Sequence, residues 1–408
     1  PRRRAVQVDL FPTGTVDSVS VSKTFTPDLQ GDFTGGGVDI KTKDIPEGPI
    51  LQVSVSAEHD SLATDIEDFL TYEGGGVDRW ASGANDRAVP EAARAEFPTL
   101  PFPTLSAPEG SPALEDARFY DQVTKAFEPV MGTTRGQTDA NRSYSLVGGN
   151  RFRLGRDDRL FGLIGAFTYS RKYDFYGDGT NNQGVVTSAG EPISILKPRS
   201  DARGTEELLI GALANAVIQL NDNHDLSLKW ILNKGAEDQA RLQVRELSAT
   251  SFEQNQSLQY TEREVSSLQL HGNHDISWSA DAGPIAVSWR AARNDTSQDQ
   301  PDVRFFRNVF DEATGTGRVP PNSTDAGNTR RIWRLIDEQN DQGGLDVIWP
   351  FLQWSETAGS VKFGAYSERT ERDYEQTSFT YRFSNQFGNA FFNPVVRDNA
   401  ARSFFTQE

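Results

Sequence analysis

The chain has 408 residues, and its 41 basic and 58 acidic side chains give it a formal net charge of −17. Such an acidic chain repels phosphate backbones, so nucleic acid is not an expected partner. The sequence contains no cysteine, which excludes disulfides, thiolate zinc sites and cysteine nucleophiles. Its apolar runs are also shorter than the roughly 18 residues that predict a membrane-spanning helix.

The first 48 residues combine alternating segments with a glycine cluster. Residues 16–23 and 38–42 alternate between apolar and polar side chains, which predicts two strands. Gly35 to Gly37 lie between them and allow tight backbone turns. A phosphate-binding loop would require a following Gly-Lys-Ser/Thr, which is missing here. The glycine run therefore predicts a turn.

The rest of the chain predicts nine longer strands with two unlike faces. In one of them, Phe161, Leu163 and Phe167 fall on one face while Gly162 and Ala166 fall on the other. The predicted strands span residues 50–58, 143–154, 160–171, 205–220, 226–248, 257–279, 285–293, 329–352 and 360–382. We therefore expect an all-β protein.

The connections between these strands alternate in length. Short turns rich in Asp, Asn and Gly are predicted near residues 155–158, 221–225, 280–284 and 354–359. Long polar connections are predicted at 59–141, 172–204 and 294–328, with a shorter one near Ser251. Several long loops count against a compact soluble domain. They are typical of outer-membrane barrels, which have short periplasmic turns and long extracellular loops.

Residues 8–43 resemble the C-terminal end of the plug domain of TonB-dependent receptors. The motif residues that carry this resemblance are Phe11, Pro12, Lys23, Pro27, Asp28, Gly31, Gly35, Gly36 and Gly37. Segments 69–80, 148–152, 301–304 and 344–351 are similar to barrel strands and loops of the subfamily that often carries a carboxypeptidase-like regulatory domain before its plug.

The resemblance implies two domains and a fragment of a larger protein. Residues 1–48 would be the end of the plug, and residues 49–408 would be the first nine or so antiparallel strands of a 22-stranded transmembrane β-barrel. The implied location is the outer membrane of a Gram-negative bacterium, in contact with its lipid. The implied function is active uptake of a scarce or bulky nutrient, driven by the proton-motive force.

The resemblance also implies protein partners but no catalytic activity. TonB, with ExbB and ExbD, would act through the missing N-terminal part of the plug. The extracellular ligand is left open among glycan, siderophore and peptide. No catalytic residue, cofactor or metal site is expected, and we do not expect an enzyme. His271 and His274, for example, are three residues apart, so on a strand they face opposite sides.

Aromatic residues are the remaining candidates for binding. Tyr72 and Trp80, in the first long loop, are the candidate ligand contacts. Five other aromatic residues lie in predicted strands, where interfacial belts are favoured over stacking on sugars: Tyr169, Trp230, Trp278, Trp289 and Trp349.

Two other classes of protein use the same alternation. A secreted or surface β-rich module for ligand binding or adhesion would have connections of similar length at both ends of its strands. A β-sandwich glycoside hydrolase would bring two carboxylates together in a cleft. Both alternatives stay open at this point.

Overall fold

The computed structural model describes most of the chain. The described residues are 16–22, 37–42, 48–97, 106–155, 159–181, 184–185, 194–195, 199–279, 282–313, 316–318, 329–354 and 357–380. They form strands, two short 3-10 helices (Asn85–Arg87 and Glu91–Arg94) and one α-helix, α1 (Pro112–Ala126). The expected all-β class is confirmed.

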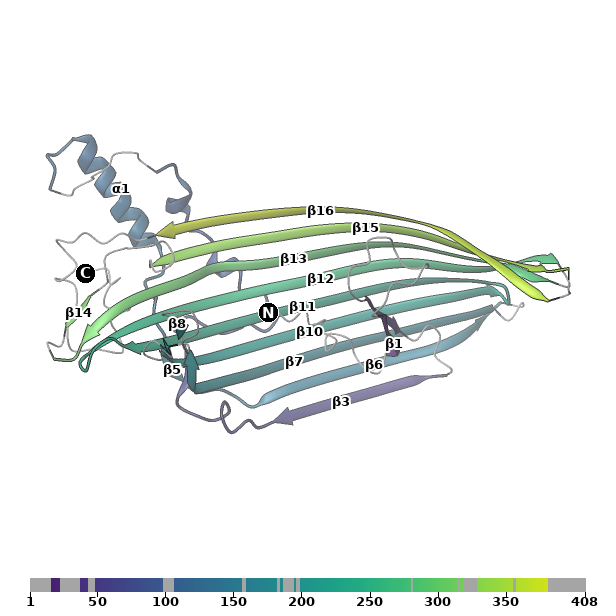
Figure 1. The fold of residues 1–408 in the computed structure, drawn as a ribbon, viewed down its shortest axis with the longest axis horizontal. Helices are drawn as coiled ribbons and strands as arrows, with labels where there is room; N and C mark the ends of the chain where they lie inside the picture. The colour runs from purple at the N-terminus through teal and green to yellow at the C-terminus, as the bar shows by residue number, and fades with distance from the viewer. Residues whose placement is uncertain are drawn as a thin grey trace.

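Nine strands form one large antiparallel sheet in which sequence neighbours pair with each other (Figure 1). In order across the sheet they are β3 (Ile50–Glu58), β6 (Asn141–Leu154), β7 (Arg159–Asn181), β10 (Arg199–Asn221), β11 (His224–Glu246), β12 (Ser251–Ser279), β13 (Gly283–Asp311), β15 (Arg330–Leu352) and β16 (Ala358–Thr380). The short β14 (Thr316–Arg318) pairs with the end of β13. Each predicted strand has its counterpart here.

Several strands continue into segments that were expected to be loops. β13 runs to Asp311, although its predicted end was residue 293. Residues 294–308 are mostly polar, yet they pair with β12 on one side and, up to Phe305, with β15 on the other. Pairing with two neighbours satisfies the backbone groups of a segment that has little strand propensity of its own. β7 also extends beyond its predicted end, to Asn181, where its pairing continues with β10 but not with β6.

The connections differ between the two ends of the sheet, which Figure 1 shows at its left and right. At one end, short turns join β6 to β7, β10 to β11, β12 to β13 and β15 to β16. The other end carries longer connections, of which residues 59–140 form the longest. The alternation was predicted correctly with one exception: residues 247–250 join β11 to β12 by a tight turn.

The sheet has two faces, which we name by their side chains on β11. Face A carries Leu228, Trp230 and Asp238, and face B carries Lys229 and Asn233. The ladder between β11 and β12 has no register shift, so each face is continuous along these strands.

Face A is apolar in the half of the sheet next to the short turns. Large apolar side chains there are more than a third exposed, and they include Tyr144, Leu146, Phe152, Leu163, Phe167, Leu228, Trp230, Leu268, Leu270, Ile276, Trp278, Leu345, Trp349, Phe351, Val361 and Phe363. We call this surface the apolar band. It runs along β11 from residue 226 to 232, along β7 from 161 to 169 and along β12 from 268 to 278.

Face B is mainly polar at the same level. Amide and hydroxyl side chains bond to each other across four strands there, as in the pairs Ser267–Asn294 (2.6 Å) and Asn294–Asn340 (3.2 Å). A small buried cluster of Val147, Ile164, Ala166 and Leu213 interrupts this polar surface. The two faces therefore differ most where face A carries the apolar band.

The other half of face A is covered by the described parts of residues 59–140, which are 59–97 and 106–140. Leu70 and Tyr72 pack on Ala202, Ala240 and Leu258 of the sheet. Further along the segment, three small apolar residues contact the sheet at Leu208, Ile210, Ala236 and Tyr260. The end of α1 packs on Trp333 and Phe379. These contacts bury the part of face A that lies beyond the apolar band.

One close approach fixes where this segment can lie. At Gly204 of β10, a Cβ atom would overlap the carbonyl oxygen of Leu70 in β4 (Phe69–Thr71). Only glycine lets the two backbones come this near. The short β4 pairs with β5 (Thr134–Gly136), so the two ends of the segment are joined to each other above this point.

The remaining strands form two further pairs. β1 (Val16–Ser22) pairs with β2 (Gly37–Thr42), and β8 (Gly184–Val185) pairs with β9 (Ser194–Ile195). Gly37 begins β2, whereas the other plug-motif residues, Phe11, Pro12, Lys23, Pro27, Asp28, Gly31, Gly35 and Gly36, lie outside the described residues. The plug domain and the 22-stranded barrel therefore remain predictions. No helix in the described part of the chain is long and apolar enough to cross a membrane.

Candidate functional site

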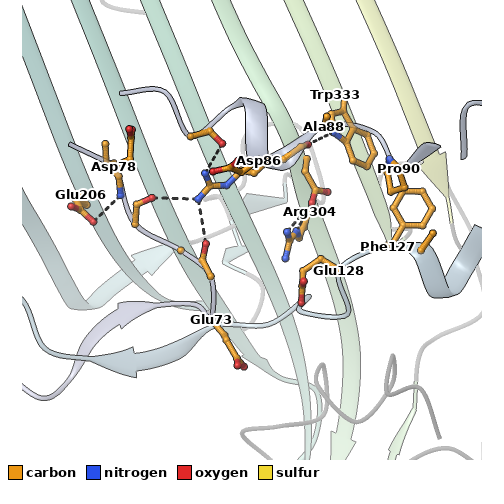
Figure 2. Close-up of a pocket in the computed structure, with 18 of the residues that line it drawn as sticks. Glu73, Asp78, Asp86, Ala88, Pro90, Phe127, Glu128, Glu206, Arg304 and Trp333 are labelled. Carbon is orange, nitrogen blue, oxygen red and sulfur yellow. Dashed lines mark hydrogen bonds and ion pairs between the residues drawn. The ribbon is translucent and has the colours of Figure 1, made fainter. Parts of the chain in front are cut away.

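A cavity of about 930 Å³ lies between residues 73–90, residues 126–128 and the sheet (Figure 2). Its floor is formed by side chains of four strands: Arg171 and Tyr173, Glu206, Asp302 and Arg304, and Trp333. This volume is in the range of pockets that take small-molecule ligands.

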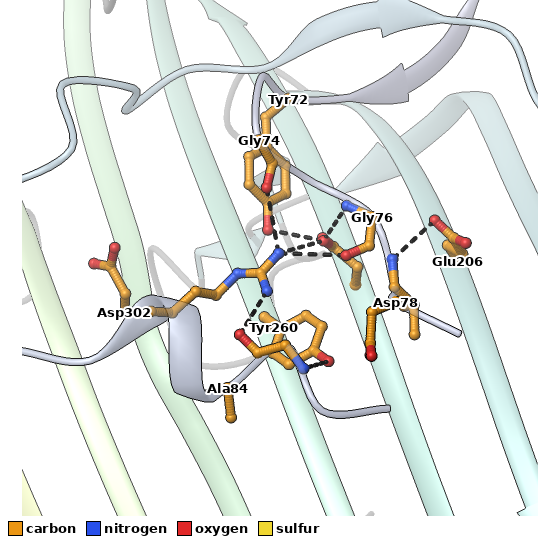
Figure 3. Close-up of polar contacts among 12 residues, drawn as sticks. Tyr72, Gly74, Gly76, Asp78, Ala84, Glu206, Tyr260 and Asp302 are labelled. Atoms are coloured by element: carbon orange, nitrogen blue, oxygen red, sulfur yellow. Dashed lines mark hydrogen bonds and ion pairs between the residues drawn. The ribbon is translucent and has the colours of Figure 1, made fainter. Parts of the chain in front are cut away.

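Arg87 organises the first wall of the cavity. Its guanidinium donates hydrogen bonds to the carbonyl oxygens of Gly74 (3.3 Å), Gly76 (3.3 Å) and Gly83 (3.0 Å). It also lies over the ring of Tyr260, with its central carbon 4.0 Å from the ring centre. Figure 3 shows Gly74, Gly76 and Tyr260, which all contact this arginine, close together. One largely buried side chain, 13% exposed, thus holds two turns of the segment on the sheet.

Asp238 of β11 anchors the same wall from below. One carboxylate oxygen accepts hydrogen bonds from the Tyr72 hydroxyl (2.9 Å) and the Gly76 N–H (2.6 Å), and it lies 3.6 Å from the Arg87 guanidinium. Burial raises the pKa of Asp238 to about 6, although Arg87 and both hydrogen bonds oppose this shift. Burial and the nearby Asp238 also raise the pKa of Tyr72 far above its ordinary value.

Two more carboxylates hold the segment through its backbone. Glu206 accepts hydrogen bonds from Arg171 (2.7 Å) and from the Val77 N–H (3.3 Å). Glu262 accepts from the Ala84 N–H (2.8 Å) and from the Tyr260 hydroxyl (2.8 Å). Backbone groups that would otherwise be buried without partners are satisfied in this way.

The second wall is fixed by a buried ionic cluster in β13 and β15. Asp302 pairs with Arg304 (2.7 Å) and lies 3.0 Å from Nε of Arg331, and all three side chains are at most 7% exposed. Both arginines also donate to backbone carbonyls beyond α1: Arg304 to Val130 (2.6 Å) and Arg331 to Glu128 (2.7 Å). Asp302 has a φ of +54°, at a register shift in β13.

The lining of the cavity is dominated by carboxylates. It includes six acidic residues, Glu73, Asp78, Asp86, Glu128, Glu206 and Asp302, and three basic ones, Arg87, Arg171 and Arg304. The net formal charge of the lining is therefore 3 − 6 = −3. Its carboxylates do not make a metal site, because no group of three or more potential ligands comes together in the described residues. The cavity suits non-covalent binding of a ligand.

The two aromatic residues predicted as ligand contacts lie in different settings. Tyr72 is only 6% exposed and bonds to Asp238, so it anchors the segment beside the cavity. Trp80 is 58% exposed and lies outside the cavity lining. The resemblance pointed to this loop, but it gave no sign of Arg87 or Asp238, which are far apart in the sequence.

A pair of histidines is another contact that the sequence pattern did not reveal. His224 and His274 are directly opposite each other on β11 and β12, and their Nδ1 atoms are 3.1 Å apart. The Trp289 indole N–H donates to Nε2 of His274 (3.0 Å). His271 lies on the opposite face, as expected for a residue three positions from His274.

The aromatic residues predicted for interfacial belts lie on face A. Trp278 and Trp349 pack edge to face with ring centres 5.3 Å apart, at the edge of the apolar band next to the short turns. Tyr144 and Tyr169 lie at its other edge, with ring centres 6.1 Å apart.

Comparison with known proteins does not identify this chain. No protein-family model matches it, and no curated protein or solved structure is significantly similar to it.

Proposed function

We propose that this chain is part of a TonB-dependent transporter of the outer membrane, which takes up a nutrient by using the proton-motive force. The observation that carries the proposal is the apolar band. It crosses most of the strands of the sheet, stays on one face and lies next to the short turns. A water-soluble protein rarely exposes one continuous apolar surface of this extent.

The depth of the band reaches the thickness of a bilayer along β12 and is somewhat less along β11. The band covers 7 residues of β11 (226–232) and 11 residues of β12 (268–278). A tilted strand needs about 9–11 residues to cross the hydrocarbon core. The Trp278–Trp349 and Tyr144–Tyr169 pairs border the band on its two sides, where membrane proteins place their aromatic belts.

The other features fit the same arrangement. Short turns next to the band match the periplasmic ends of barrel strands, and long connections at the far ends match extracellular loops. Face B, with its amides and hydroxyls, would line the lumen. The plug-like motif in the first 48 residues supports coupling to TonB, ExbB and ExbD, and the cargo stays open among glycan, siderophore and peptide.

The alternative is a secreted or surface β-rich module for binding or adhesion. Such a module buries one face of its sheet against a second layer. In the described residues, the apolar band has no such layer over it, since Leu268 is 50% exposed and Trp278 58%. The unequal connections at the two ends also favour the transporter.

Paired cysteine substitutions test the location of the band. The sequence has no cysteine, so Leu228→Cys and its neighbour Ser227→Cys each create a single labelling site on opposite faces of β11. In isolated outer membranes, we expect Cys at 228 to react with a lipid-soluble maleimide and to resist a charged one. Cys at 227 should show less protection from the charged reagent. The secreted or surface module would be favoured if the protein is recovered without membranes and both cysteines react equally with the charged reagent.

Sequencing the DNA on both sides of this coding segment tests the transporter as a whole. We expect the reading frame to continue upstream into the start of a plug and a signal peptide, and downstream through about thirteen more two-faced strands. A frame that contains neither would contradict the proposal. If the frame continues as expected, the neighbouring genes would also indicate the class of cargo.

A further inference from the structure

Three ring side chains meet on face A near the short turns. His224 of β11, His274 of β12 and Trp289 of β13 lie on neighbouring strands, and each is half-buried. The rings of Trp289 and His274 are stacked at 25° with centres 6.5 Å apart, and the two imidazole centres are 5.1 Å apart. Side-chain contacts therefore join three strands at this point.

Trp289 determines where the protons of the two histidines lie. An indole N–H can only donate a hydrogen bond, so Nε2 of His274, 3.0 Å away, must carry a lone pair. A neutral imidazole has one N–H, which in His274 is then at Nδ1. This N–H faces Nδ1 of His224 at 3.1 Å, so Nδ1 of His224 accepts and its proton is on Nε2. The lone pairs of both neutral rings are therefore in use.

The position of the indole depends on Gly272. This glycine is opposite Trp289 in the ladder between β12 and β13. A Cβ atom at position 272 would lie only 2.6 Å from Nε1 of Trp289. Any other residue at this position would therefore push the indole N–H away from His274.

The strands around the cluster carry no charged side chain beside it on face A in the described residues. Its closest neighbours on that face are Asn221, Leu226, Ile276 and Val287. The first charged side chains on face A of β10 to β13 are four or more residues away along their strands: Glu206, Lys234, Glu264 and Arg293. Asp225 and Asp275 are next to the histidines in sequence but lie on face B, and Asp222 lies in the turn. A proton added to either ring thus meets no carboxylate on the strands of this face.

We propose that His224, His274 and Trp289 form a pH-sensitive switch, which joins the short-turn ends of β11, β12 and β13 and opens in two steps in acid. The first proton is held best at Nε2 of His274, because the charged ring then donates a stronger hydrogen bond from Nδ1 to His224. This proton displaces the indole N–H of Trp289. A second proton, at Nδ1 of His224, places two positive rings in contact, and the histidines separate. Histidine changes its charge between about pH 5 and pH 8, so we expect the steps in that range.

The switch does not rest on the proposed function, which only gives it a location. With the apolar band in lipid, the three rings would lie at the periplasmic edge of the barrel wall. Opening would release side chains of three strands at this edge, while the backbone ladders between the strands remain.

Nitrogen NMR of the purified full chain, isotope-labelled in histidine and tryptophan, tests the switch. At about pH 8 we expect the proton of His274 on Nδ1 and that of His224 on Nε2. As the pH is lowered to about 5, the indole signal of Trp289 should shift in the same step in which His274 becomes charged, before His224 does. His271, on face B, is the internal control, because its charging should leave the Trp289 signal unchanged. A proton on Nε2 of His274 at pH 8, or a Trp289 signal that does not follow His274, would overturn the proposal.

Gly272→Ala moves the indole without removing a titrating group. We expect the Trp289 signal of this variant to lose its pH response. His274 should become charged at a higher pH than in the unmodified chain, because its neutral form has lost a hydrogen bond. The matched control is Gly343→Ala, which adds the same methyl group to β15 at a position with no neighbouring atom within 4 Å. Its titration should match that of the unmodified chain.

A second variant removes the same hydrogen bond by a different route. Trp289→Phe keeps an aromatic ring but has no N–H donor, so it should also raise the pH at which His274 becomes charged. The thermal midpoint of each variant checks that it is folded. If His274 titrates in the folded variants as it does in the unmodified chain, the switch is contradicted.

Discussion

The two halves of face A have the same alternation but opposite surroundings. In the half next to the short turns, Leu268 is 50% exposed and Trp278 58%. In the other half, Leu208 is fully buried and Tyr260 is 1% exposed, because residues 59–140 cover them. The difference shows that alternation gives a strand its two faces, whereas its neighbours decide what each face contacts. One half is left exposed in the described residues, and the other is covered by the protein's own loop.

The largest effect is expected in the covered half. Arg87→Ala leaves the carboxylate of Asp238 buried without its cationic partner. Removing one member of a buried ion pair costs about 3–5 kcal/mol. We expect residues 59–140 to detach locally, which limited proteolysis would detect as new cleavage in this segment. Arg94→Ala is the matched control, since that side chain is 56% exposed and its cleavage pattern should not change.

A charge in the apolar band gives the next largest effect. Leu228→Arg would place a guanidinium in lipid if the band crosses the membrane, at a cost of about 2–4 kcal/mol near its centre. We expect less folded protein in the outer membrane, measured by heat-modifiable gel mobility. Ser227→Arg puts the same side chain on face B and should be tolerated better. Equal yields of the two variants would remove the distinction between the faces.

The pH dependence of stability sharpens the comparison further. The folded-state pKa of Asp238 is about 6, above the ordinary value of 3.8, so between these values the folded protein binds the proton more tightly than the unfolded chain. Its contribution to stability is therefore complete below about pH 4 and is lost as the pH rises towards 6. The slope is at most about 1.4 kcal/mol per pH unit.

Asp238→Asn isolates this contribution. Between pH 4 and pH 6, the urea midpoint of the unmodified chain should fall relative to that of the variant. Above pH 6, the difference between the two midpoints should stay constant. Other titrating groups are common to both proteins and largely cancel. A difference that is independent of pH would mean that Asp238 is not buried as described.

The smallest effect concerns α1, at the edge of the covered half. The Ser111 hydroxyl accepts a hydrogen bond from the Leu114 N–H (3.4 Å) at the start of the helix. Ser111→Ala should cost about 1 kcal/mol of helix stability. Hydrogen exchange in residues 112–116 should become faster, while exchange in β11 should not change. Faster exchange in both would mean that the helix and the sheet unfold together.

The alternation of apolar and polar side chains was enough to predict the strands but not their full length. Phe161, Leu163 and Gly162 give a two-faced pattern that the structure keeps. The extension of β13 to Asp311 could not be read from polar residues that become strand only when both neighbours pair with them. The local sequence determines which side chains lie on each face of a strand, and pairing between strands determines where the strand ends.

The cavity was largely outside the reach of sequence analysis. Arg87 and Asp238 are neighbours only because residues 59–140 fold back over the sheet. Tyr72 was singled out by its motif, but its hydroxyl is used within the protein. An arginine among polar loop residues has no periodicity that would mark it, so long-range contacts of this kind need the three-dimensional structure.

Under the proposed function, the length of the strands has a consequence for recognition at the cell surface. β12 and β13 contain 29 residues each, which is about 100 Å of extended chain at roughly 3.4 Å per residue. The band uses little more than a third of β12. If the band crosses an outer membrane, as proposed, the rest would stand in the polysaccharide layer outside it, with the described parts of residues 59–140 on its flank. Antibodies and phages that approach from the side would therefore meet this segment before they meet the channel opening.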